Sequence, residues 1–206
     1  MVMHKKGNGV GNPNAENEMI DNSVDADADI QDKLDLSVRP IEQSDTWDCG
    51  PTALAMALQY QFSLKLTASE TILLCGATPS GTDEYNFAKA LDILGFKYKQ
   101  SNSGSLNKLK KSILKNQTPL VHLVIQTGEG HYVVVTGYDE ENVRVADPAS
   151  GKIVTYGIPY FMGIWKIEEK EQQTRWYMCI TNRVENKIPA VITKYKKIMK
   201  KLKNLK

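Results

Sequence analysis

The feature that most constrains the fold is a run of ten uncharged residues, 51–60, directly after Cys49-Gly50. Alanine and leucine would occur all round a helix formed by this run, and a helix that is apolar on every side is usually buried at the centre of a domain. Asp48 is a candidate N-cap, and Pro51 is tolerated in a first helical turn. The run predicts a buried helix over residues 49–61 with Cys49 at its N-terminal end, where free N–H groups and the helix dipole favour a thiolate.

A cysteine alone is weak evidence of chemistry, because free cysteine is among the most buried residue types. The chain has three, Cys49, Cys75 and Cys179, and this small, odd number argues against a disulfide framework. No Cys-x-x-Cys motif or Cys/His cluster suggests a metal, and we expect no cofactor. The sequence shows neither the apolar run of a secretory signal nor one long enough to span a bilayer, so we expect a cytoplasmic protein.

Charge divides the 206 residues into three parts. Residues 1–36 carry eight acidic and three basic side chains and no aromatic residue, which predicts a disordered acidic leader. Residues 37–183 form the predicted domain, which is long enough to bury a core without disulfides. From residue 187 on there are eight lysines and no acidic residue, so residues 184–206 are predicted to form a basic helical tail.

The tail repeats apolar residues at helical spacing, which makes the predicted helix amphipathic: Ile192, Tyr195, Ile198, Met199, Leu202 and Leu205. One interpretation is a surface helix whose lysines are solvated. Others are a helix that lies on an anionic membrane surface, a contact with nucleic acid, or a site onto which the acidic leader folds back. The middle of the chain is nearly neutral, so we expect no nucleic-acid partner.

Between the two tails, the period of the apolar residues changes from helical to extended. Further helices are predicted over residues 67–74, with Thr67 and Glu70 as a capping box, over 82–94 and over 105–115. In the 82–94 helix, the residues predicted to face the core are Tyr85, Phe87, Ala88, Leu91 and Leu94. Runs rich in Val, Ile, Tyr and Thr predict strands over residues 118–126, 130–138, 142–147, 152–156 and 175–181. Helices first and an antiparallel sheet second indicate the α+β class.

Three histidines are possible partners of Cys49. His4 lies in the predicted leader, and His122 lies in an apolar strand, which is the usual pattern of a core or edge histidine. His131 follows Glu129-Gly130 and opens a strand, so it should lie at an end of the sheet from which a side chain reaches a cleft.

The strand after His131 ends in Asp147-Pro148. If these two strands form an antiparallel hairpin with Thr136 opposite Asn142, then Asp147 lies directly opposite His131 on the same face, with Cβ atoms about 5 Å apart. A carboxylate at that distance fixes the imidazole tautomer and stabilises the imidazolium. The alternative is an ordinary cross-strand pair.

Gln43, six residues before Cys49, is a candidate donor to a developing oxyanion. An extended segment before the helix would place its side-chain amide beside the backbone N–H of Cys49. A thiol, an oriented imidazole and an oxyanion donor are the parts that cysteine-dependent acyl transfer needs. The alternative is that Gln43 is an ordinary loop residue.

These motifs closely resemble the bacteriocin-processing cysteine peptidases, cysteine peptidase family 39, which are papain-like. The resemblance rests on Gln43 and Asp48-Cys49-Gly50, on Gly130-His131 with the valines after it, and on Asp147-Pro148, and it extends over about residues 38–182. It implies a papain-like α+β fold in which the central cysteine helix packs on an antiparallel sheet. It also implies that Cys49 is the nucleophile, His131 the general base, Asp147 the group that orients His131, and Gln43 part of the oxyanion hole.

The leading hypothesis is therefore a cysteine peptidase that hydrolyses a peptide or protein substrate, such as a glycine-containing leader. The best-known members of the family cut leaders after a double glycine and are fused to exporters, which implies exporter contact as a further role for the basic tail. This chain has Cys-Gly-Pro-Thr where many exporter-linked members have Cys-Gly-Val-Ala. Two alternatives remain: a transglutaminase-like thiol acyltransferase, and a non-catalytic peptide-binding module.

Overall fold

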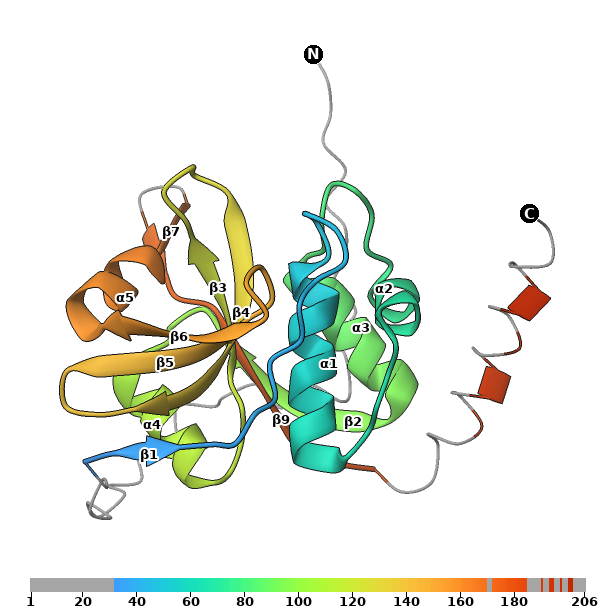
Figure 1. Ribbon diagram of the computed structural model, residues 1–206, viewed down its shortest axis with the longest axis horizontal. Coiled ribbons are helices and arrows are strands. Elements are labelled where there is room, and N and C mark those ends of the chain that lie inside the picture. Colours follow the sequence, from blue (N-terminus) through green and yellow to red (C-terminus); the bar gives the residue numbers. More distant parts are fainter. Residues whose placement is uncertain are drawn as a thin grey trace.

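The fold is a mixed sheet-and-helix arrangement with one large antiparallel sheet (Figure 1). The computed structural model describes residues 32–169 and 172–184, and six further positions between residues 190 and 201. The helices of this part are α1 (Cys49–Phe62), α2 (Ala68–Cys75), α3 (Glu84–Leu94), α4 (Leu106–Leu114) and α5 (Ile158–Ile164). The first three precede most of the sheet in the chain, as predicted, and the α+β class is confirmed.

The main sheet has the strand order β2-β9-β3-β4-β5-β6, and β1 pairs with the C-terminal end of β4. Its strands are β1 (Leu34–Asp35), β2 (Phe96–Ser101), β3 (Leu120–Val124), β4 (Gly130–Tyr138), β5 (Asn142–Asp147), β6 (Lys152–Gly157) and β9 (Tyr177–Arg183). A separate hairpin consists of β7 (Ile167–Glu169) and β8 (Gln172–Thr174). The bounds of β4 and β5 are those that the sequence predicts.

Helix α1 is the central helix that the uncharged run predicts. Every residue from Cys49 to Leu58 is buried. The helix contacts β4 and β3 on one side and α2 on the other (Figure 1). A charged side chain at any of these positions would lose its hydration without a partner, so only an uncharged run can form this helix.

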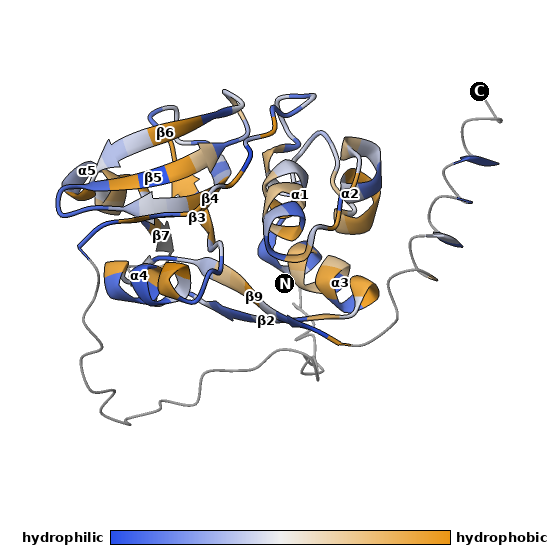
Figure 2. Cartoon of the chain, turned by 60° about the horizontal axis from the view of Figure 1, so that its bottom comes forward, coloured by the Kyte–Doolittle hydropathy of each residue, from blue (hydrophilic) through white to orange (hydrophobic). Residues whose placement is uncertain are grey.

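The sheet separates two hydrophobic cores. Alternation along β4 turns Tyr132 and Val134 toward the core that contains α1, and Val133 and Val135 toward the core that contains α4 and α5. In Figure 2, α1, α2 and α3 lie together, whereas α4 lies apart from them. Because both faces are covered, the middle of β4, from Tyr132 to Val135, is a continuous buried run instead of alternating with polar residues.

Local capping determines where the shorter helices begin. The capping box of Thr67 and Glu70 is present at α2. At α3 the side chain of Asp83 caps the helix, so α3 begins at Glu84, two residues later than predicted. The prediction that Tyr85 faces the core is wrong: Tyr85 lies in the exposed first turn and is 74% exposed.

The predicted tails fall mainly outside the described residues. This holds for residues 1–31 of the leader; the prediction of disorder up to residue 36 is wrong at its end, because Leu34 and Asp35 form β1. It also holds for most of residues 184–206, whose described positions from 190 on are helical and exposed. Among the helices that are described, none has the length and apolar character needed to cross a membrane.

Candidate active site

Cys49 occupies the first turn of α1, at the end of the helix that meets β4. It is 9% exposed and lines a pocket of about 470 Å³. The next residue must be glycine, because a Cβ at Gly50 would clash with Thr82 and would lie 2.9 Å from the ring of Phe87. Gly50 therefore lets the N-terminal end of α1 approach α3 closely, which fixes the position of the thiol.

His131 and Asp147 form a short contact behind this pocket. Nε2 of His131 lies 2.6 Å from Oδ1 of Asp147, and the two side chains are 13% and 12% exposed. The carboxylate also accepts hydrogen bonds from the backbone N–H of Ala149 at 2.9 Å and from the hydroxyl of Ser150 at 3.0 Å. Burial opposes ionisation of Asp147, but these hydrogen bonds lower its pKa. The carboxylate is thus ionised and held in one orientation.

The imidazole of His131 is also coupled to Cys49. Burial works against the charged ring, but hydrogen bonds to Asp147 and Cys49, together with the charges of both groups, raise the pKa of His131 to about 9. Because Nε2 faces Asp147, Nδ1 is the nitrogen that remains for the thiol. The imidazole therefore lies between the carboxylate and the sulfur, in a setting that favours its protonated form.

The predicted register of the β4–β5 hairpin is wrong. The pairs are Val134 with Ala146 and Val135 with Val145, and a bulge precedes the pair of Gly137 with Arg144. Asp147 comes directly after Ala146, so this register places it opposite Val133, and it is diagonal to His131. The displacement is by an even number of residues, which keeps both side chains on one face, and the long imidazole spans the diagonal.

The reason for the register error lies at the other end of the hairpin. The carboxylate of Asp139 accepts hydrogen bonds from the backbone N–H groups of Glu141 and Asn142, and Asp139 N–H donates to the carbonyl of Asn142. These bonds make a turn of four residues. The bulge beside Thr136 then takes up one further residue of β4, which the sequence does not reveal.

Gln43 lines the same pocket as Cys49 and His131. Its backbone N–H donates to the carbonyl of Pro148 at 2.9 Å, which joins its loop to the residue after Asp147. Its side-chain Nε2 donates to the carbonyl of Asp45, whereas Oε1 is buried and has no partner within the described part of the chain. The side chain is held by its nitrogen, and one N–H of that amide is not used in this contact.

Asp48 stands at the N-cap position of α1, but the prediction that its side chain caps the helix is wrong. Its carboxylate turns back and accepts hydrogen bonds from the hydroxyl of Ser44 at 2.6 Å, from Ser44 N–H at 3.2 Å and from Asp45 N–H at 3.0 Å. Asp48 is completely buried. It therefore holds the loop that carries Gln43, and the Ser44-to-Asp48 spacing, typical of side-chain-to-backbone turns, is the signal that could have revealed this.

The other groups named from the sequence lie apart from this site. Cys75 and Cys179 are buried and do not line the pocket, and His122 contacts Glu84 instead of Cys49. Within the described residues there is no group of three or more side chains that could hold a metal ion. The sequence did not reveal Ser150 as a positioning residue, and it indicated for Asp48 a different role, that of N-cap.

A thiol at the N-terminal end of a buried helix, beside a His–Asp pair at the end of an antiparallel sheet, defines a papain-like cysteine peptidase fold. The sequence profile described as "Peptidase C39 family" matches residues 37–168. The chain belongs to the Peptidase C39 family.

Two curated relatives illustrate the match. An uncharacterized protein of Methanothermobacter thermautotrophicus is 34% identical over 115 residues, which are 55% of this chain and 73% of that protein. The lactococcin-G-processing and transport ATP-binding protein LagD of Lactococcus lactis is 32% identical over 114 residues, which are 55% of this chain but 16% of LagD. The chain thus matches a small part of the length of LagD.

Two solved structures share the fold. The peptidase domain of Streptococcus ComA, described as a bifunctional ABC transporter, superposes with a TM-score of 0.59 at 20% identity, covering 71% of this chain and 99% of that one. A double glycine motif protease from an AMS/PCAT transporter, in complex with its leader peptide, gives a TM-score of 0.54 at 22% identity, covering 71% and 94%. The papain-like α+β fold expected from the sequence is confirmed.

Proposed function

We propose that this protein is a cysteine peptidase in which Cys49 is the nucleophile, His131 the general acid and base, Asp147 the group that orients His131, and Gln43 an oxyanion donor. The observation that carries the proposal is the 2.6 Å contact between His131 Nε2 and Asp147 Oδ1. The same imidazole is also coupled to Cys49 by a hydrogen bond. This arrangement supports a thiolate–imidazolium pair, the activated form of a cysteine nucleophile.

In the acylation step, the Cys49 thiolate attacks the carbonyl carbon of the scissile peptide bond, and a C–S bond forms as the carbonyl π electrons move to oxygen. The oxyanion accepts hydrogen bonds from the backbone N–H of Cys49 and from the unused amide N–H of Gln43. The His131 imidazolium gives its proton to the amine as the C–N bond breaks. This leaves a thioester on Cys49 and a neutral imidazole.

In the deacylation step, neutral His131 takes a proton from water, and the resulting hydroxide attacks the thioester carbon. The C–S bond then breaks, which releases the carboxylic acid and restores the thiolate–imidazolium pair. Asp147 stays ionised throughout, because its role is to hold the ring and to stabilise its charge.

The names of the relatives indicate which substrates to test first. LagD is named for processing as well as transport, and one of the similar solved structures is a double glycine motif protease with its leader peptide bound. We therefore propose leader peptides that end in Gly-Gly as the first substrate class. Contact of residues 184–206 with an exporter or a membrane surface is a secondary proposal that follows from the same names and from the lysine content of that segment.

The decisive test uses the purified full chain and a synthetic peptide with a leader ending in Gly-Gly, with products identified by mass spectrometry. Cys49→Ser should lower the cleavage rate by at least about 100-fold, because a serine hydroxyl is a far weaker nucleophile in this setting. The matched control is Cys179→Ser: Cys179 already donates to the hydroxyl of Ser112, so the same chemical change there should leave cleavage unchanged. Equal cleavage by Cys49→Ser and wild type would refute the proposal.

A second readout needs no substrate. Iodoacetamide at neutral pH should alkylate Cys49, which lines an open pocket, much faster than Cys75, because burial raises the pKa of Cys75 to about 12. His131→Ala should slow the alkylation of Cys49 and leave the other two cysteines unaffected. Peptide mapping by mass spectrometry measures all three rates in one experiment.

A further inference from the structure

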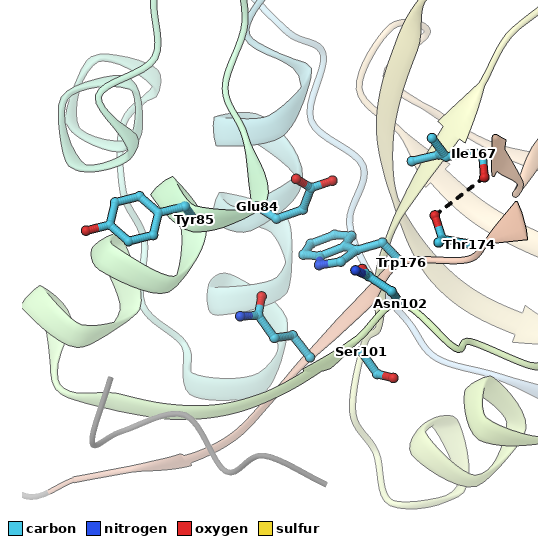
Figure 3. A pocket seen from close by; sticks show the side chains of 8 residues that line it. Glu84, Tyr85, Ser101, Asn102, Ile167, Thr174 and Trp176 are labelled. Carbon is cyan, nitrogen blue, oxygen red and sulfur yellow. Dashed lines mark hydrogen bonds between the residues drawn. The ribbon is translucent and has the colours of Figure 1, made fainter. Parts of the chain in front are cut away.

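Figure 3 shows a second pocket, of about 440 Å³. One side chain, His122, connects it with the candidate active site. Gly130, which lines the first pocket, is packed so tightly on His122 that a Cβ would clash with Nε2 of the ring. Nδ1 of the same ring lies 3.1 Å from Oε1 of Glu84, which lines the second pocket. A single imidazole ring thus lies between a wall residue of one pocket and a wall residue of the other.

The second pocket presents a negative charge. Glu84 is the charged residue among its described lining residues, and its side chain is 34% exposed. A hydrogen bond from His122, which outweighs the effect of burial, lowers the pKa of Glu84, so its carboxylate is ionised. An ionised carboxylate has about four acceptor sites. That of Glu84 accepts from His122, from the hydroxyl of Tyr132 and from a backbone N–H, which leaves room for one further donor.

A second acceptor in the pocket has no partner. Gln100 lies on β2 and lines the pocket, and its Oε1 atom is buried with no hydrogen-bond partner among the described residues. A buried acceptor of this kind is uncommon in a native protein, because it has lost its hydration and gained nothing in return. A ligand that brings N–H donors would satisfy it.

The floor of the pocket is aromatic and firmly held. Trp176 is 4% exposed and packs against Phe87 and Tyr132, with ring centroids 5.9 Å and 5.8 Å away, and these two rings also contact each other. In Figure 3 the side chain of Glu84 is drawn next to the indole of Trp176, whereas the ring of Tyr85 points away from both. Ile167 adds an apolar surface on the side of β7. A carboxylate beside an indole suits a cation that arrives on an apolar stem.

We propose that this pocket binds the side chain of a lysine or arginine of the peptide substrate, with the cation between Glu84 and Gln100 Oε1 and the alkyl stem on Trp176. The inference rests on the proposed function, because it takes the occupant of the cleft to be a peptide. An extended peptide advances about 3.3 Å per residue, so the distance between the two pockets fixes the number of residues between the basic residue and the bond at Cys49. The protein is then selective for substrates with a basic residue at a fixed distance from the cleavage site.

The binding test requires no hydrolysis. The full chain is titrated with Nα-acetyl-lysine amide or Nα-acetyl-arginine amide, and binding is followed by the NMR signal of the Trp176 indole N–H, assigned with Trp176→Phe. The neutral analogue Nα-acetyl-norleucine amide has nearly the same stem and no charge. We expect the titration of the Trp176 signal to give a Kd at least about tenfold lower for the cationic amides than for the neutral one.

Three variants locate the binding. Glu84→Gln keeps an acceptor for His122 but removes the charge, and Gln100→Leu removes the unpaired oxygen at nearly constant volume; each should weaken binding about tenfold. Gln100→Leu should not destabilise the protein, because it removes a buried acceptor that has no partner. The matched control is Asp83→Asn, which removes a unit charge one residue away and preserves the cap of α3, so binding should stay unchanged.

A cleavage series then separates this inference from the proposed function. Gly-Gly leader peptides that differ by one lysine-to-norleucine exchange, moved along the sequence, should show one position at which the exchange lowers kcat/KM, and Glu84→Gln should abolish that preference. Equal binding of the neutral and cationic amides, or Cys49-dependent cleavage without any preference for lysine, would overturn the pocket assignment and leave the peptidase intact. Binding of the cation without cleavage of any peptide would overturn the peptidase and leave the cation pocket.

Discussion

Among single residues, Asp48 is the one on which the proposed oxyanion donor depends. Its buried carboxylate accepts three hydrogen bonds from Ser44 and Asp45, and the carbonyl of Asp45 in turn accepts the side-chain N–H of Gln43. Asp48→Ala leaves those donors without a partner and loosens the loop. We expect a loss of about 1–3 kcal/mol in the free energy of unfolding and a fall of about tenfold in kcat with a smaller change in KM, because Gln43 acts on the transition state.

The control for this variant is Asp45→Ala, which removes an exposed carboxylate from the same loop but keeps the backbone groups that make the contacts. It should behave as wild type in urea denaturation and keep the wild-type kcat; because Asp45 also lines the pocket, any effect on cleavage should fall on KM. If Asp48→Ala changed stability and KM but left kcat unaltered, Asp48 would support the fold and not the oxyanion donor.

The pH profile reports on His131 and Asp147. The mechanism needs the imidazolium, and the pKa of His131 is raised to about 9, so kcat/KM should fall as pH rises through about 9. Asp147→Asn removes the carboxylate that raises this pKa while burial, which lowers it, remains. The alkaline limb should therefore move down by about one pH unit or more, and kcat at neutral pH should fall on the order of 100-fold.

Asp139→Asn is the matched control, because Asp139 is a carboxylate at the opposite end of the same hairpin. Its pH profile should keep the alkaline limb of the wild type. An unchanged limb in Asp147→Asn would mean that the contact between His131 and Asp147 does not stabilise the imidazolium.

Among the elements, those that the sequence predicts best are the ones whose own residues decide their structure. Helix α1 follows from an uncharged run, α2 from a capping box, and β4 and β5 from β-branched runs bounded by turn residues. Strand β2 was missed although Phe96 and Tyr98 are buried and alternate with exposed lysines, a period-2 signal. Helix α5 was missed because it is only seven residues long and begins with Ile158-Pro159, a pattern that reads as a turn.

What the sequence could not reveal is how separate elements meet. The four proposed catalytic residues could be named from motifs, but their geometry depends on the bulge in β4 and on the way in which Asp48 holds the preceding loop. Both features involve contacts that no local pattern determines. The cation pocket is a stronger example, since Glu84 lies in α3, Gln100 in β2, and Trp176 in the segment directly before β9.

Strand β1 depends on a glycine in β4. A Cβ at Gly137 would clash with Oδ1 of Asp35 and lie 2.7 Å from the carbonyl of Leu34, so any larger residue pushes β1 away. Gly137→Ala should therefore lower the free energy of unfolding by about 1–3 kcal/mol, as overpacking does. Gly163→Ala in α5 is the control, because a Cβ there meets nothing within 4 Å and alanine is the better helix former; it should not lower the free energy of unfolding. Equal stability of the two variants in urea would mean that β1 contributes nothing to the fold.

In the whole molecule, α1 is fixed to the sheet at both ends, and the two attachments have different consequences. At its N-terminal end, α1 contacts β4 and presents the thiol of Cys49. At the other end, Gln61 donates to the carbonyl of Ile180 in β9 at 2.9 Å, and its Oε1 accepts from the N–H and hydroxyl of the buried Thr118 at 2.9 Å and 2.7 Å. At a rise of about 1.5 Å per residue, the two ends are about 18 Å apart.

Gln61→Leu should therefore separate stability from chemistry. It leaves the N–H and hydroxyl of Thr118 buried without a partner, so we expect a loss of about 2 kcal/mol or more in the free energy of unfolding, while kcat/KM at a temperature where the protein is folded stays within about twofold of wild type. The control is Gln126→Leu, the same change at an exposed position. Urea unfolding followed by far-UV circular dichroism and by tryptophan fluorescence should give coincident transitions in both variants. The reason is that α1 packs both on α2 and on the sheet and so couples their unfolding. Two separate transitions in Gln61→Leu would show instead that the helical layer and the sheet unfold independently, and that Gln61 is what joins them.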